Sequence, residues 1–135
     1  MNRKNRVRSS LVWLRLGVFL VFFAWTLDKF VNPGHASKVF EGFYGISLPA
    51  NSLLFGLAFL ELLVILAFLA GLWKTWTYGF VLVFHGISTL SSYEQYIPHY
   101  GADVNLLFFA AWPMLAACWV LFSLRDLDTK WTVTK

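Results

Sequence analysis

The sequence predicts an all-α integral membrane protein: a bundle of four transmembrane helices with a short interfacial helix after the first span. Two observations predict this fold. The 135 residues are 59% hydrophobic and only 13% charged, with a mean hydropathy of +0.63, which is more apolar surface than a soluble domain of this size buries. Four apolar stretches are also long enough to cross a hydrocarbon core of about 30 Å as helices. We expect helices because lipid offers no partners to the backbone of an open strand.

The stretch from Asn51 to Leu72 is the strongest span, and it carries Glu61 at its centre. At a rise of about 1.5 Å per residue, it covers roughly 33 Å. An acidic group at a helix centre costs roughly 2.5 to 3.5 kcal/mol on insertion scales, so it must be protonated, paired or facing a polar cavity. Two interpretations stay open: a proton-handling or ligand-binding group, or a neutral acid that fixes the packing against another helix.

The first span, Leu11–Val31, follows a basic N-terminal segment, residues 1–10. Its apolar run is too long for a signal-peptide core, so we expect a retained first helix. Arg15 is expected near the inner interface, in contact with lipid phosphate. Lys29 is expected to extend outward to the headgroups. The alternative for Lys29 is that it turns inward, toward an anionic ligand or Glu61.

The segment between the first two spans predicts a helix too short to cross the membrane. Residues 32–34, Asn-Pro-Gly, end the first helix, because proline cannot continue it. The stretch from His35 to Leu48 then has an apolar edge and predicts an interfacial helix. Pro49 and Asn51 are expected to turn the chain into the second span.

The third span, Trp73–Ser92, follows a very short connection and carries a polar series. The gaps in this series are three, seven, four and three residues, which place its members on one helical face. We expect this face to point into the bundle. The series consists of Thr75, Tyr78, His85, Thr89 and Ser92.

The fourth span runs from about Val104 to Leu124 and carries a polar and aromatic series on one face. Asn105, Trp112 and Trp119 recur every seven residues, so they share one side of the helix. We take Asn105 and Trp112 as candidate ligand-binding residues. Pro113 is expected to kink this helix.

Charge distribution predicts the orientation. With the N-terminus inside and four crossings, nine of the eleven Lys and Arg residues are cytoplasmic, including Lys74 and those of the tail, residues 125–135. Only Lys29 and Lys38 lie outside, which satisfies the positive-inside rule. We therefore expect a multi-pass protein of the inner (plasma) membrane with both termini cytoplasmic. The net charge of +4 is an orientation signal and does not indicate nucleic-acid binding.

Glu61 and His85 are predicted to share a depth in the membrane. Glu61 lies about 15 Å from the outer surface and His85 about 12 Å, and their helices are antiparallel neighbours. We expect a hydrogen bond or ion pair between them, in which the two side chains share one proton. Such a pair suits proton-coupled chemistry on a quinone-like carbonyl, with Lys29 and Tyr78 assisting. The alternative is a polar clasp between two helices, worth about 0.6 to 2 kcal/mol.

No metal site is predicted. Bis-histidine haem ligation needs a second histidine at the depth of His85, and none is expected there. The single Cys118 excludes an intrachain disulfide and a CxxC motif, and we expect it to be a small core residue. Four further candidates on the outer side lack the spacing of a metal site: His35, Glu94, His99 and Asp103.

The segments LRLGVFLVFFAWTLDKFVNP and GLAFLELLVILAFLAGL, with a histidine in the third helix, resemble the DoxX/DoxD-like membrane protein family. The resemblance covers about Leu11 to Ser123. Its most telling residues are Lys29 with Phe30 and Pro33, followed by Gly56 and Glu61. The resemblance implies a four-helix membrane bundle. Some relatives are quinone-linked oxidoreductase subunits, as in thiosulfate oxidation, and others partner redox or detoxification enzymes. Eukaryotic relatives include cargo-receptor and receptor-assembly proteins.

Three functions therefore stay open. The leading hypothesis is the membrane component of a quinone-linked redox system, with Glu61 and His85 as catalytic residues and a quinone as cofactor. The second is a non-catalytic accessory, assembly or scaffold subunit of a larger membrane complex. The third is a small transporter. In each case the expected partners are the lipid bilayer and either another membrane protein or a second copy of the chain.

Overall fold

The computed structural model describes residues 1–47, 52–97 and 105–134, and over these ranges it is all-helical, without strands. Predictions that involve Pro49, Asn51, His99 or Asp103 lie outside the described residues. The α helices are α1 (Arg3–Val31), α2 (Pro33–Tyr44), α3 (Ser52–Ala70), α4 (Lys74–Ser91) and α5 (Ala111–Ser123). Two 3-10 helices, η1 (Tyr93–Gln95) and η2 (Leu106–Ala110), follow α4 and precede α5.

The ends of α1 and α2 follow from local sequence. The side chain of Asn2 accepts a hydrogen bond from the backbone N–H of Asn5 at 2.9 Å, so α1 begins within the basic segment, before the predicted span. Pro33 occupies the first turn of α2, where its missing N–H interrupts no helical bond. Gly45 ends α2 with a φ of 65°, a left-handed conformation that glycine adopts without strain. The short helix predicted after the first span is thus present as α2.

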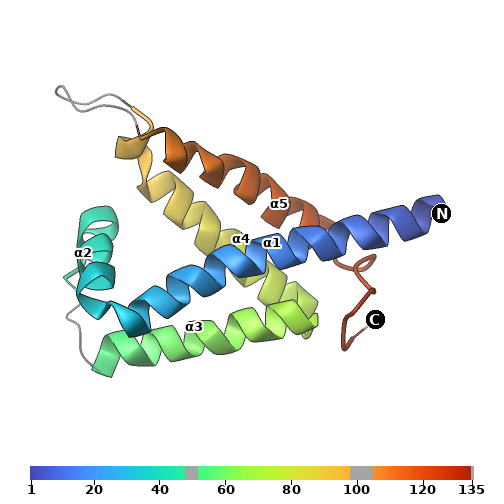
Figure 1. The fold of residues 1–135 in the computed structure, drawn as a ribbon, viewed down its shortest axis with the longest axis horizontal. Helices are drawn as coiled ribbons and strands as arrows, with labels where there is room; N and C mark the ends of the chain where they lie inside the picture. Colours follow the sequence, from blue (N-terminus) through green and yellow to red (C-terminus); the bar gives the residue numbers. More distant parts are fainter. Residues whose placement is uncertain (48–51, 98–104, 135) are drawn as a thin grey trace.

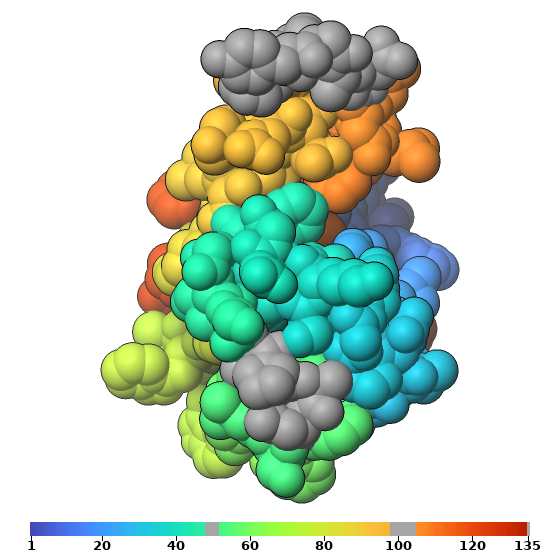
Figure 2. Space-filling view, turned by 90° about the vertical axis from the view of Figure 1, so that its left-hand side faces the viewer, coloured from blue at the N-terminus to red at the C-terminus, as the bar shows by residue number. Residues whose placement is uncertain are grey.

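The helices form two pairs, with α1 packed along α3 and α4 packed along α5. Figure 1 shows the pairs meeting near the end of the molecule that holds both termini and diverging toward α2. At the wide end α2 contacts both α1 and α4. Seen from that end, α2 covers the middle of the molecule, between α3 and the end of α4 (Figure 2). The fold is therefore a wedge whose open end is capped by α2.

The hydrophobic core occupies the narrow half of this wedge. Its buried members come from the first two-thirds of α1, the end of α3, the start of α4 and the end of α5. Cys118 belongs to this core, as the sequence predicted. A second, smaller cluster joins α2 to the start of α3. It consists of Ala36 and Leu54, with Phe40 packed against it. The main core consists of Leu11, Val18, Phe22, Ile65, Phe68, Tyr78, Val81, Cys118 and Leu121.

Three helical segments are long and apolar enough to cross a membrane: α1, α3 and the continuous stretch Leu106–Ser123 formed by η2 and α5. This is consistent with a membrane protein. The 18-residue α4 is more polar and does not belong to that group. Pro113 lies in the first turn of α5, where proline is tolerated, and the irregular backbone precedes it as η2.

Candidate functional site

A cavity of about 670 Å³ lies between the two helix pairs. It begins beneath α2 at the wide end of the wedge and extends along α1 as far as Trp13. This volume is within the range of small-molecule sites, which are mostly apolar with a few placed polar groups. Among the described residues, α3 contributes a single lining residue, Glu61. The cavity therefore presents a few ionisable groups, the acids Glu61 and Asp28 among them, on a largely apolar wall.

Glu61 forms a buried ion pair with Lys29. The Lys29 Nζ lies 2.5 Å from Oε2 of Glu61, and the two side chains are 13% and 9% exposed. The hydroxyl of Thr26 lies 2.8 Å from Oε1 of Glu61 and 2.8 Å from the Phe22 carbonyl oxygen, so it can donate to either acceptor. Thr26 and Lys29 are three residues apart on α1 and thus share the face that packs on α3.

The prediction that Lys29 extends outward is wrong, and the alternative, that it turns inward toward Glu61, is what the structure has. A buried carboxylate without a partner is strongly destabilising, and Lys29 is the cation within reach. Thr26 was missed as a site residue. Its position, one helical turn before Lys29, was the available signal.

His85 lies on the opposite wall of the cavity, on α4. Its Nε2 lies 3.0 Å from the carbonyl oxygen of Ala111 on α5, so the protonated nitrogen donates across the α4–α5 pair. The hydroxyl of Thr89 donates to the His85 carbonyl at 2.8 Å. The ring of Phe22 meets the imidazole edge-on, with 6.1 Å between centroids. These contacts fix the orientation of the imidazole.

The expected direct bond between Glu61 and His85 is replaced by separate partners, Lys29 with Thr26 for the first and Ala111 with Thr89 for the second. The prediction assumed that helices joined by a short loop pack together along their length. Instead α3 packs mainly on α1 and α4 mainly on α5, so the helices carrying the two residues diverge. Both residues nevertheless line the same cavity.

Two further polar contacts surround the cavity near α2. Tyr44 and Ser88 join α2 to α4, with 2.7 Å between their hydroxyl oxygens. Asp28 and His35 join the end of α1 to α2, with 2.6 Å between Oδ2 and Nδ1. Both contacts hold α2 over the wide end. Sequence reasoning did not assign Tyr44, Ser88 or Asp28 to the site, because only the position of α2 brings them together.

Three of the predicted site residues lie elsewhere. Asn105 caps η2, with its side-chain oxygen accepting a bond from the Leu107 N–H at 3.3 Å. Trp112 is 43% exposed and packs against the ring of Tyr96, 5.6 Å away. Neither lines the cavity, so the seven-residue pattern of the fourth span faces outward and the ligand-binding prediction for these two residues finds no support here. Tyr78 is buried at the opposite, narrow end.

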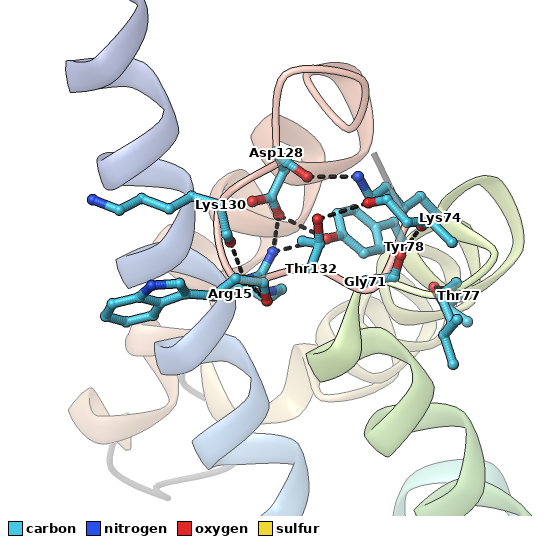
Figure 3. Close-up of polar contacts among 11 residues, drawn as sticks. Arg15, Gly71, Lys74, Thr77, Tyr78, Asp128, Lys130 and Thr132 are labelled. Carbon is cyan, nitrogen blue, oxygen red and sulfur yellow. Dashed lines mark hydrogen bonds and ion pairs between the residues drawn. The ribbon is translucent and has the colours of Figure 1, made fainter.

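Tyr78 belongs to a second polar cluster, which we call the inner cluster: Arg15, Lys74, Tyr78 and Asp128 (Figure 3). The Arg15 Nη1 lies 2.7 Å from Oδ2 of Asp128, and Tyr78 donates to the same oxygen at 2.6 Å. Lys74 donates to the backbone carbonyl of Asp128 at 2.6 Å. The cluster ties the C-terminal tail to α1 and α4.

Arg15 also donates from Nη2 to the carbonyl oxygens of Lys130, at 2.9 Å, and Trp131, at 3.1 Å. Arg15 and Asp128 are 1% and 0% exposed, so the prediction that Arg15 contacts lipid phosphate is wrong. The sequence signal that was missed is Asp128, one of two aspartates in the tail, residues 125–135. The tail covers the narrow end of the wedge.

No family model, curated protein or solved structure matches this chain. Within the described ranges, no group of three or more His, Cys, Asp or Glu residues could hold a metal ion.

Proposed function

We propose that this chain is a four-helix integral protein of the inner membrane, with both termini cytoplasmic, that binds a quinone-like molecule in its cavity. In this proposal it is the membrane component of a quinone-linked redox system, as its resemblance to the DoxX/DoxD-like family implies. The observation that carries the proposal is the buried Lys29–Glu61 ion pair, which lines an apolar cavity together with His85. Intramembrane ionisable residues typically mark a ligand or proton path.

The proposal that α4 crosses the membrane is supported by the hydrogen bonds of its polar side chains. Thr77 and Thr89 are buried and donate to backbone carbonyls of Leu72 and His85, each at 2.8 Å. Polar side chains satisfied in this way do not face lipid, so a modest overall hydropathy is compatible with a helix inside a bundle. Both α4 and α5 would then cross the membrane as an antiparallel pair.

Each polar group has a separate role in this proposal. Lys29 donates a hydrogen bond to one carbonyl oxygen of the ring, because it lines the cavity and its ammonium group lies beside Glu61. Glu61 and His85 exchange protons with the two oxygens from opposite walls. Reduction of a quinone to a quinol takes two electrons and two protons. The electrons come from a redox partner protein, and the protons pass through these side chains.

The test is equilibrium binding of a tail-less dimethoxy-methyl-benzoquinone to the protein in lipid nanodiscs. We expect Glu61→Gln to weaken binding by about tenfold or more, the range for losing a charge-assisted hydrogen bond. Glu41→Gln is the matched control, because Glu41 is exposed on α2 and does not line the cavity. It should bind as the wild type does.

A charge swap separates this role from a purely structural clasp. The double variant Lys29→Glu/Glu61→Lys restores an ion pair between α1 and α3 and should recover the thermal stability lost in either single variant. If the pair is only a clasp, quinone binding is recovered as well. If the pair contacts the ligand, thermal stability is recovered and quinone binding is not, because the donor and the acceptor have exchanged positions.

A second candidate is a non-catalytic accessory subunit of a larger membrane complex. It is favoured by the lack of any redox-active cysteine pair, since Cys118 is the single cysteine and is buried. Purification in mild detergent discriminates the two. A stoichiometric protein partner without a bound small molecule supports the accessory role, and a quinone that disappears in Glu61→Gln supports the redox site.

A further inference from the structure

The cavity is longer than a site for one ring requires. Along α1 its wall runs from Trp13 to Lys29, sixteen residues, or about 24 Å at 1.5 Å per residue. The polar groups lie toward one end of this length, near α2. The remainder of the wall, toward the narrow half, carries no charged side chain among the described residues. A ligand that fills the whole cavity is therefore polar at one end and apolar along the rest.

The apolar part of the wall is formed by one face of α1 and the facing side of α5. Trp13, Gly17 and Val21 follow one another at intervals of four residues and so lie in a row on α1. Met114 and Ala117 line the cavity from α5. We call these five residues the tail track. Small side chains at Gly17 and Ala117 leave room between the two helices.

The tail track is open to the outside of the molecule along its length. Trp13 is 74% exposed and Val21 is 40% exposed. Apart from the two neighbouring residues and the local backbone of α1, no atom lies within 4 Å of the position that a Cβ on Gly17 would take. In a helix that crosses a bilayer, this exposed side faces the acyl chains. A molecule dissolved in the bilayer can thus enter sideways, whereas α2 covers the wide end (Figure 2).

We infer that the cavity binds an amphiphile with a long alkyl or isoprenoid tail: the carbonyl head lies at Lys29 and Glu61, and the tail lies in the tail track between α1 and α5. This inference rests on the proposed function and names its ligand class. The bilayer, and not the aqueous phase, supplies the ligand. A tail that lies between the helices also accounts for the length of the cavity, which runs beside the core residues Val18 and Phe22.

Gly17→Phe tests the tail track directly. The substitution fills the space between α1 and α5 without touching the polar end of the cavity. Binding of the tail-less benzoquinone and of its decyl analogue is measured in nanodiscs, with ligand expressed as a mole fraction of the membrane so that partitioning does not enter. We expect Gly17→Phe to weaken decyl-quinone binding by about tenfold or more, because the phenyl ring occupies the space of the tail, and to change tail-less binding by less than about twofold.

Gly56→Phe is the matched control. Gly56 is likewise exposed with nothing within 4 Å, but it lies on α3 outside the cavity. It should change neither affinity. Equal decyl-quinone binding by Gly17→Phe and the wild type overturns the tail track while leaving the head site standing. Failure of both compounds to bind the wild type overturns the proposed function and the inference together.

Photolabelling keeps the test decisive should Gly17→Phe not fold. A decyl quinone with a diazirine at the end of its tail should label Trp13, Gly17 or Ala117 of the wild type, and excess unlabelled decyl quinone should abolish this labelling. Labelling that resists competition would mean that the tail track holds only bulk lipid, and would overturn the inference.

Discussion

Arg15 and Asp128 form the most deeply buried ion pair in the described part of the chain, with 2.7 Å between Nη1 and Oδ2. Removing one partner leaves a buried charge unpaired, which costs about 3 to 5 kcal/mol. We expect Arg15→Met and Asp128→Leu each to lower the unfolding temperature of the detergent-solubilised protein, measured by intrinsic fluorescence. The double variant Arg15→Met/Asp128→Leu should recover much of the loss, because apolar replacement of a whole buried pair is often neutral.

Arg8→Met serves as the control for this residue-scale prediction, because Arg8 is exposed on the same helix. It should unfold at the wild-type temperature. A double variant no more stable than its singles would contradict the view that the pair acts as a unit, and would assign the stability to the bonds from Arg15 to Lys130 and Trp131.

Sequence reasoning at this scale found the buried charge but not its partner. Glu61 is recognisable because a carboxylate stands out in an apolar run, and the cost of burying it requires a partner. Choosing between Lys29 and His85 depends on which helix packs against α3, and that information is not local. The prediction that Arg15 contacts lipid was wrong for the same reason, since its partner Asp128 is more than a hundred residues away along the chain.

The turn between α3 and α4 is fixed by a close approach of the C-terminal tail. Gly71 has a φ of 70°, and a Cβ there would lie 2.5 Å from Cγ2 of Thr132. The backbone N–H of Val133 donates to the Ala70 carbonyl at 2.8 Å, and Thr134 donates to the carbonyl of Gly71. A side chain at position 71 therefore displaces the tail.

We expect Gly71→Ala to destabilise the protein by about 1 to 3 kcal/mol, through backbone strain and overpacking. It should also speed tryptic cleavage after Lys130, measured by mass spectrometry, because the displaced tail becomes accessible. Gly42→Ala is the control, since Gly42 lies within α2 with open space around it. Unchanged cleavage in Gly71→Ala would mean that the inner cluster alone holds the tail.

Helix existence was well predicted from the sequence, because apolar runs and the Asn-Pro-Gly breaker are local signals. Each of the five expected helical segments has a counterpart in α1 to α5. The polar face of α4 was also predicted in part: Tyr78, Thr89 and Ser92 are buried, whereas Thr75 is exposed. The wedge was not predictable, because it depends on how the helices pair and on α2 holding the wide end apart.

At the scale of the whole molecule, the number of crossings decides where the two ends lie. Figure 1 shows the N-terminus, the α3–α4 turn and the tail at one end of the molecule, as four antiparallel crossings require. If only the three most apolar helical segments crossed the membrane, the two termini would lie on opposite sides. Whether α4 crosses as well therefore decides between these two arrangements.

We predict four crossings, and cysteine accessibility in intact cells tests this. In a Cys118→Ala background, which removes the single native thiol, cysteines at Arg3 and Asp126 report the two ends and a cysteine at Glu41 reports α2. A membrane-impermeant maleimide should label the Glu41 site directly, and the other two only after permeabilisation. Labelling of Asp126 but not Arg3 in intact cells would mean three crossings. In that case α4 would lie outside the bilayer, and His85 would face water instead of the membrane cavity that the proposed proton path needs.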